Sequence, residues 1–312
     1  MLGRPSTPIA PIARKIHGNS MKPFKFVTAA LGAATLCLGA CDKIGKSGNE
    51  QESAAFGAAT SNQLNAFIEA HNRLLGPLGF TEKAANYRKA DVAHATTEGE
   101  FLVDAGWIDK GIEQLKAARA LSGASADLNG AADALIASLT AARVHLADLA
   151  PYYTSKAYLN DKLARGRKED PKMLAELDAA DADLKRFGEM LDRETVKRDT
   201  AALEKLKAEG KVLDYNRRLA MFQANAMVKR FAAAQAPDTS LFALADRDAA
   251  IIDEAIAAAH AAAAKSGGKD PAELHYLSSM LGSYRTFKET RRPTHAEHMV
   301  GSYNSAVEAA TW

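Results

Sequence analysis

The chain has 312 residues, of which 47% are hydrophobic, 25% charged and 7% aromatic. This composition belongs to a globular chain with enough apolar material for a hydrophobic core, and it excludes a largely disordered protein. The net charge of +2 comes from residues 1–41, which contain five basic residues and no acidic one, so the remainder carries −3. A nucleic-acid-binding protein needs a concentrated basic face, and the absence of one excludes that function class.

The N-terminal segment has the organisation of a secretory signal peptide. Two lysines precede an apolar stretch, residues 26–38, and small residues come directly before Cys41. The apolar stretch has about 13 residues, fewer than the ~20 that a membrane-spanning helix requires. Residues 1–40 are therefore predicted to be a cleaved signal peptide, with translation starting at Met21.

The residues Leu38-Gly39-Ala40-Cys41 resemble the lipobox of bacterial lipoproteins. The resemblance implies that the Cys41 thiol receives a diacylglycerol carrying fatty-acyl chains such as palmitate, and that Cys41 becomes the first residue after cleavage. Such chains attach a protein to a membrane with about 0.8 kcal/mol per buried methylene group. We expect a lipid-anchored protein of the bacterial cell envelope that faces the periplasm, on either the inner or the outer membrane.

Cysteine use agrees with this expectation. Cys37 leaves with the signal peptide and the sulfur of Cys41 becomes a thioether, so the mature chain retains no free thiol. Disulfides, thiolate metal sites and cysteine nucleophiles are therefore excluded.

The segment after the lipidated cysteine is predicted to be a flexible tether. Residues 42–60 are rich in Gly, Ser, Ala, Lys and Glu and contain few apolar residues, a composition typical of linkers. No later segment resembles a second linker of this length. Residues 61–312 are therefore predicted to form one domain.

The sequence predicts an all-α body, an elongated bundle of long antiparallel helices. Ser61 is expected to cap the first helix, which Gly76-Pro77 should end. Two later segments carry apolar residues at alternating steps of four and three, the spacing of antiparallel bundles and coiled coils. These positions are Leu135, Leu139, Ala142, Leu146, Leu149 and Tyr153 in the first segment and Met173, Leu177, Ala180, Leu184, Phe187 and Leu191 in the second.

Further helices are predicted towards the C-terminus. An apolar stripe consists of Val212, Tyr215, Leu219 and Phe222. An alanine-rich helix is expected over residues 238–265. It should end there, because Ser266-Gly267-Gly268 breaks the helix. Two shorter helices should begin near Pro271 and Pro293, since proline suits the first helical turn.

A group of tyrosines with two charged residues is the strongest candidate for a binding surface. Pro151 should bend or restart a helix there and gather the neighbouring side chains within about two turns. The group consists of Tyr152, Tyr153, Lys156, Tyr158 and Asp161. Tyrosines combine apolar area with a polar end and are common at binding surfaces, but the same rings could instead close the end of a bundle core.

A short motif occurs three times, each time as a ring residue, an asparagine and an aliphatic residue three places on. The three copies are His71-Asn72, Tyr215-Asn216 and Tyr303-Asn304. Each asparagine should lie at the edge of an apolar helix face, where its amide could bond to a neighbouring helix. Chance repetition in an alanine-rich chain is the alternative explanation.

The chain resembles the YiiG-like bacterial lipoproteins, a family of unknown function. The resemblance rests chiefly on Tyr152-Tyr153-Thr154-Ser155-Lys156-Ala157-Tyr158, followed by Asp161, Gly166 and Lys168, and on the copies of the asparagine motif near the two ends. It implies a helical, lipid-anchored envelope protein and no particular activity.

No catalytic motif is present. Neither Gly-x-Ser-x-Gly nor His-Glu-x-x-His occurs in the sequence, so no catalytic residues and no cofactor beyond the covalent lipid are predicted. His295 and His298 would share a helix face, and His275 could approach from the preceding helix to bind a metal. We therefore expect a non-enzymatic module that binds an envelope protein or a ligand, with a metal-binding protein and a structural spacer as alternatives.

Overall fold

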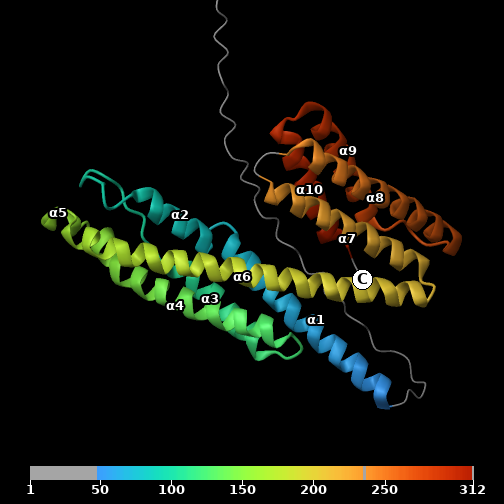
Figure 1. Cartoon of the computed structure of the whole chain (residues 1–312), viewed down its shortest axis with the longest axis horizontal. Helices are drawn as coiled ribbons and strands as arrows, with labels where there is room; N and C mark the ends of the chain where they lie inside the picture. The colour runs from blue at the N-terminus through green and yellow to red at the C-terminus, as the bar shows by residue number, and fades with distance from the viewer. Residues whose placement is uncertain (1–47, 235–236, 311–312) are drawn as a thin grey trace, which may run out of the picture.

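The computed structural model describes residues 48–234 and 237–310, and these residues form α-helices and no strand (Figure 1). The helices are α1 (Gly48–Leu75), α2 (Phe80–Ala90), α3 (Gly106–Ala120), α4 (Ala126–Thr154), α5 (Tyr158–Asp161), α6 (Ala164–Ala208), α7 (Val212–Ala233), α8 (Thr239–Ser266), α9 (Ala272–Thr290) and α10 (Pro293–Ala309). The all-α prediction is confirmed. None of the described helices is long and apolar enough to cross a membrane. The predicted signal peptide and Cys41 lie outside the described residues.

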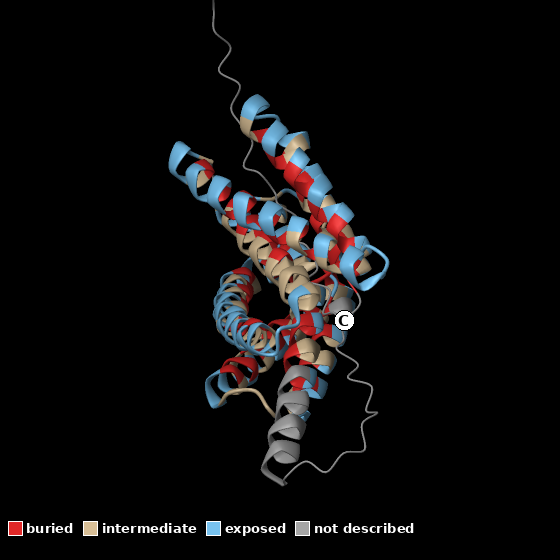
Figure 2. Ribbon diagram, turned by 90° about the vertical axis from the view of Figure 1, so that its right-hand side faces the viewer, coloured by how far each residue is buried: buried red, intermediate tan, exposed pale blue. Residues whose placement is uncertain are grey.

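Helix α6 organises the molecule. It has 45 residues, which at ~1.5 Å per residue corresponds to roughly 68 Å, and it runs along most of the horizontal length of the molecule in Figure 1. Its first half lies antiparallel to α4, because the short α5 reverses the chain between the two helices. All heptad positions predicted for these segments are buried, and Figure 2 shows the buried residues on the inner sides of the helices.

The first hydrophobic core is formed by α1 to α4 and the N-terminal half of α6. Gln63 on α1 is buried and connects α1 to the end of α3 and the start of α4. Its amide nitrogen donates to the Ala118 carbonyl oxygen at 3.2 Å and to Asn129 Oδ1 at 3.0 Å, and its Oε1 accepts from the Ala124 N–H at 2.6 Å. One side chain thus satisfies backbone groups where α3 ends and α4 begins.

The second hydrophobic core is formed by α7 to α10. Asp238 caps α8 by accepting a hydrogen bond from the Leu241 N–H at 2.8 Å, and Gly267 ends that helix with a φ of 69°, a conformation that favours glycine. Helix α9 follows Pro271, and α10 begins at Pro293. The predicted starts and ends of these helices are confirmed.

Helix α6 belongs to the first core and contacts α7 of the second, and polar side chains lie at this junction. Arg198 on α6 donates to Asn65 Oδ1 on α1 at 2.9 Å. Asp199 on α6 accepts from Arg218 on α7 at 3.0 Å. The division into two cores could not be predicted from the sequence, because a continuous helix joins them and no linker marks the boundary.

Two predictions of helix position differ from the structure. Helix α1 begins at Gly48, so Ser61 lies within a helix and is not its N-cap, and residues 48–60 are helical where a flexible tether was predicted. Alanine and glutamate recur in that segment and favour helix. The apolar stripe starting at Val212 is only partly buried, and of its residues Leu219 packs against the second core. Val212 is exposed, whereas the buried residues of α7 are Ala220, Ala224, Met227, Val228 and Phe231.

Candidate functional site

A groove between α4 and α6 is the candidate site, because it contains a buried histidine. It has a volume of about 610 Å³ and lies on the outer side of the antiparallel pair. The α4 side is formed mainly by small or apolar side chains, and the α6 side by charged ones. The lining residues are Ala137, Thr140, Ala141, Val144, His145 and Asp148 from α4 and Glu169, Lys172 and Glu176 from α6.

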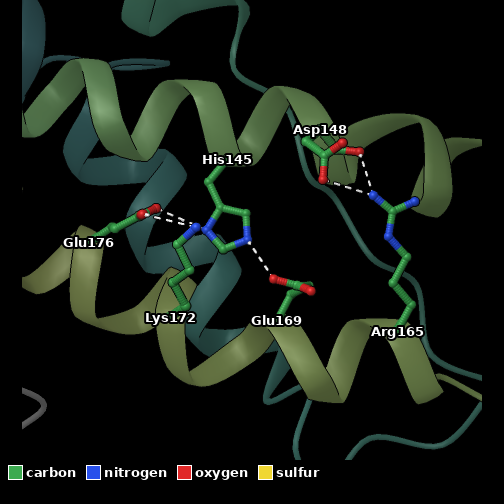
Figure 3. Close-up of polar contacts among 6 residues, drawn as sticks. All are labelled: His145, Asp148, Arg165, Glu169, Lys172 and Glu176. Atoms are coloured by element: carbon green, nitrogen blue, oxygen red, sulfur yellow. Dashed lines mark hydrogen bonds and ion pairs between the residues drawn. The ribbon is translucent and has the colours of Figure 1, made fainter.

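His145 is the central side chain of this groove, and Figure 3 shows its ring pointing from α4 towards α6. Its side chain is only 6% exposed. Nδ1 lies 2.9 Å from Glu176 Oε2, within hydrogen-bonding distance. Nε2 is buried without a hydrogen-bond partner and faces Glu169 Oε2 at 3.5 Å. The imidazole thus has one firm carboxylate partner and one nitrogen directed at a second carboxylate.

Charged side chains surround the histidine. Arg165 binds the Asp148 carboxylate at 2.8 Å, which links α6 to α4 one turn from His145. The Lys172 ammonium lies 3.9 Å from Glu176 Oε1 and is largely exposed. The groove therefore combines a mainly apolar wall on one helix with two partly buried carboxylates and an exposed ammonium group on the other.

The spacing of the helices places these residues together. On α6, Glu169, Lys172 and Glu176 are separated by three and four residues, so they share one face beside the buried heptad stripe. His145 directly precedes the heptad residue Leu146, at the boundary between the core and the groove. His145 could not be predicted as a site residue, because the sequence does not show that these two helix faces oppose each other.

The three tyrosines of the predicted binding surface are buried. Tyr152, Tyr153 and Tyr158 close the end of the first core, and Phe101 packs against the latter two with ring centroids 5.2 and 5.0 Å away. The predicted surface is therefore wrong for the tyrosine rings, which take the alternative role of closing the core. Tyrosine is amphipathic, and its apolar ring favours burial when neighbouring helices can cover it.

The two charged members of that group remain accessible. Lys156 and Asp161 are both exposed. The Tyr152 hydroxyl donates a hydrogen bond to Asp161 Oδ1 at 2.8 Å, and the Asp161 carboxylate also accepts from the Arg165 N–H at 3.0 Å. Asp161 therefore has a structural role at the start of α6, where it satisfies a backbone donor.

Two buried hydroxyl groups and a buried carboxyl group lie together at this end of the first core. The hydroxyls of Tyr87 and Tyr153 are buried without a hydrogen bond of good geometry, and both are near the buried carboxyl group of Asp170. Burial is the main cause that raises the pKa of Tyr153 to about 12, and the neighbouring Tyr152 and Asp170 contribute to this shift. Both phenols are therefore neutral at physiological pH.

The three asparagines of the repeated motif have different surroundings and form no common site. Asn216 donates to the Val212 carbonyl oxygen of its own helix at 2.8 Å, so the predicted bond to a neighbouring helix is wrong there. The Oδ1 of Asn304 is buried without a hydrogen-bond partner among the described residues. Asn72 is half-buried on α1.

His71, which precedes Asn72, lies in the contact between α1 and α6. Its ring packs against Phe187 with a centroid distance of 5.8 Å. A Cβ atom at Gly188 would lie only 2.7 Å from His71 Nε2, so glycine is required for this approach. Burial lowers the pKa of His71 to about 4. Asp192 opposes that shift, and Lys229 adds to it.

The stability of the fold should therefore fall in mild acid because of His71. The unfolded chain binds a proton near pH 6.5, whereas the folded chain resists it until about pH 4. This contribution is complete above pH 6.5 and is lost as the pH falls towards 4, by roughly 3 kcal/mol at most. Urea denaturation between pH 7.5 and 4 should show a smaller loss for His71→Leu than for the natural chain. The same replacement at exposed His298 should leave the loss unchanged.

The three C-terminal histidines are not brought together. The rings of His295 and His298 lie 6.2 Å apart on α10. Helices α9 and α10 are antiparallel, so the start of α9, which carries His275, lies beside the C-terminal end of α10. His298 is near the N-terminal end of α10, roughly 15 Å away along the helix. Among the described residues, no group of three or more potential ligands could hold a metal ion.

Comparison with known proteins identifies the chain at the level of a family. A family model with the description "Protein of unknown function (DUF3829)" matches residues 58–293, which include the groove and most of both cores. No curated protein and no solved structure shows significant similarity to the chain.

Proposed function

Because the chain belongs to the DUF3829 family, which has no assigned function, we propose a function from its own residues: a lipid-anchored, non-enzymatic binding protein of the bacterial cell envelope. The groove between α4 and α6 is its binding site, and an envelope protein is its partner. The resemblance to YiiG-like lipoproteins supports the same cellular location.

The lipobox at Cys41 supports the anchor, and the start of α1 limits how far the body can lie from it. Residues 42–47 separate Cys41 from the first described residue of α1. Six residues can span at most about 20 Å. The helical body would therefore be held close to the membrane surface.

The composition of the groove supports the proposed binding function. Val144 is 56% exposed and lies beside the smaller apolar side chains of Ala137 and Ala141, facing the charged residues of α6. An apolar wall next to a few convergent polar groups is the usual composition of a binding site. No other described groove combines a buried histidine with such a wall.

The chemistry of the groove favours binding over catalysis. Thr140 is the only lining residue with a hydroxyl group. That hydroxyl donates to the Ile136 carbonyl oxygen at 2.6 Å, so its proton is directed at the backbone and not at a base. The groove therefore offers carboxylates, an ammonium group and an imidazole for recognition, without a prepared nucleophile.

Photo-crosslinking in intact cells tests this function. A photoreactive amino acid at Val144 should give one discrete crosslinked product, because this side chain lies in the groove. The same amino acid at Val212, which is 55% exposed but outside the groove, is the matched control. Glu169→Lys should weaken the Val144 product at least several-fold. Equal products from both positions, insensitive to Glu169→Lys, would show that the groove is not the binding site.

A further inference from the structure

His145 is held in the arrangement that proteins use to orient a metal-binding imidazole. In such sites one ring nitrogen donates its proton to a carboxylate, and this bond directs the lone pair of the other nitrogen at the metal. Glu176 Oε2 lies 2.9 Å from Nδ1, while Nε2 has no hydrogen-bond partner. The side chain is more than nine-tenths buried, so its direction is fixed by packing.

Glu169 lies where the second ligand of such a metal would be. Its Oε2 is 3.5 Å from His145 Nε2, which is longer than the 2.7–3.2 Å of an ordinary N–H···O hydrogen bond. Two ligands that each bind one ion at ~2.1 Å in tetrahedral geometry are roughly 3.4 Å apart. The separation therefore matches a shared ion better than a direct hydrogen bond.

We propose that His145 Nε2 and Glu169 bind one divalent transition-metal ion of the class that prefers imidazole and carboxylate ligands, such as Zn²⁺ or Co²⁺. Glu176 is a positioning residue that fixes the tautomer of His145. If the imidazole is protonated beforehand, binding releases that proton to solvent, with no change in oxidation state.

The site would be an open one. Only two side chains supply ligands, in keeping with the absence of any group of three or more candidate ligands among the described residues. Glu169 is 29% exposed and lines the groove, so the remaining positions would be filled by water or by a group of a bound partner. Lys172 contacts Glu176 rather than Glu169 and leaves this side of the site accessible.

Metal binding to the purified full-length mature lipoprotein in detergent tests the proposal, using protein without a polyhistidine tag. Equilibrium dialysis against Zn²⁺ should give one ion per chain, and Co²⁺ should show d–d absorption bands on binding. Glu169→Gln keeps the size of the side chain and should lower the affinity at least tenfold. His145→Ala should remove saturable binding, with circular dichroism used to verify that the helices are intact.

Glu176→Gln separates a positioning role from a structural one. It should lower the Zn²⁺ affinity by about 10- to 100-fold while the melting temperature of the metal-free protein stays the same. The double variant His295→Ala/His298→Ala is the matched control and should bind as the natural protein does. Absence of saturable binding, or binding lost in this control instead of in His145→Ala, would overturn the proposal. Because purified protein is used without a partner, the outcome does not depend on the crosslinking result.

Discussion

Arg217→Met is expected to lower the free energy of unfolding by about 3–5 kcal/mol. Arg217 on α7 binds Glu273 on α9 at 2.5 Å, and the Glu273 side chain is only 1% exposed. Removal of the guanidinium group would leave a carboxylate inside the second core without its cationic partner. The desolvation of that carboxylate would then no longer be offset, which makes this one of the most damaging single changes in the chain. Urea denaturation followed by circular dichroism measures the effect.

A double variant provides the control for this experiment. Arg217→Met/Glu273→Leu replaces both charges by apolar side chains and should recover most of the lost stability, because no buried charge remains. A loss below 1 kcal/mol for Arg217→Met alone would contradict the role assigned to this ion pair.

Cys41→Ala is expected to abolish lipid attachment completely. Alanine has no sulfur atom to receive the diacylglycerol, so the chain should accumulate as an unlipidated precursor that keeps its signal peptide. Labelling of cells with an alkyne-bearing fatty acid, followed by gel electrophoresis, would show no labelled protein and a larger product.

Cys37→Ala is the matched control for the lipid anchor. This second cysteine lies only four residues earlier, within the predicted apolar stretch of the signal, and its replacement should leave labelling unchanged. Normal labelling of Cys41→Ala, or loss of labelling in Cys37→Ala, would refute the assignment of Cys41.

The sequence predicted those parts of the fold that depend on local patterns. The heptad positions from Leu135 to Tyr153 and from Met173 to Leu191 are buried because α4 and α6 each present one continuous apolar stripe. The helix ends at Gly76-Pro77 and Gly267 were predictable, because glycine and proline have strong backbone preferences. The start of α1 was missed because Gly and Ser near residue 48 resemble a linker, although the residues that follow favour helix.

Tertiary packing decided the features that the sequence could not predict. Val212 was assigned to a core stripe, but α7 contacts helices on several sides and its buried face begins at Ala220. The tyrosines at the end of α4 could have been exposed or buried. The loop that carries Phe101 covers them, and a contact so distant in sequence leaves no local pattern.

The groove is the clearest example of information that exists only in three dimensions. His145 and Glu176 are 31 residues apart, and each one alone is an ordinary polar residue beside a heptad stripe. Only the antiparallel register of α4 and α6 brings the ring between two carboxylates. The C-terminal histidines show the opposite case, since proximity in sequence suggested a site that the helix geometry does not form.

Lysine acylation of the intact envelope tests most directly whether the groove is occupied in its natural setting. Lys172 and Lys205 are a matched pair on α6, with side chains 68% and 76% exposed, and each lies 3.9 Å from a glutamate four residues later. Only Lys172 lines the groove. In the purified protein, a small acylating reagent should modify the two lysines at similar rates.

In the intact envelope, we predict that Lys172 is modified at least several-fold more slowly than Lys205, because the bound partner covers the groove. Mass spectrometry of the peptides carrying each lysine gives the two rates from one sample. A ratio of rates that is the same in the envelope and in the purified protein would contradict the proposed binding function.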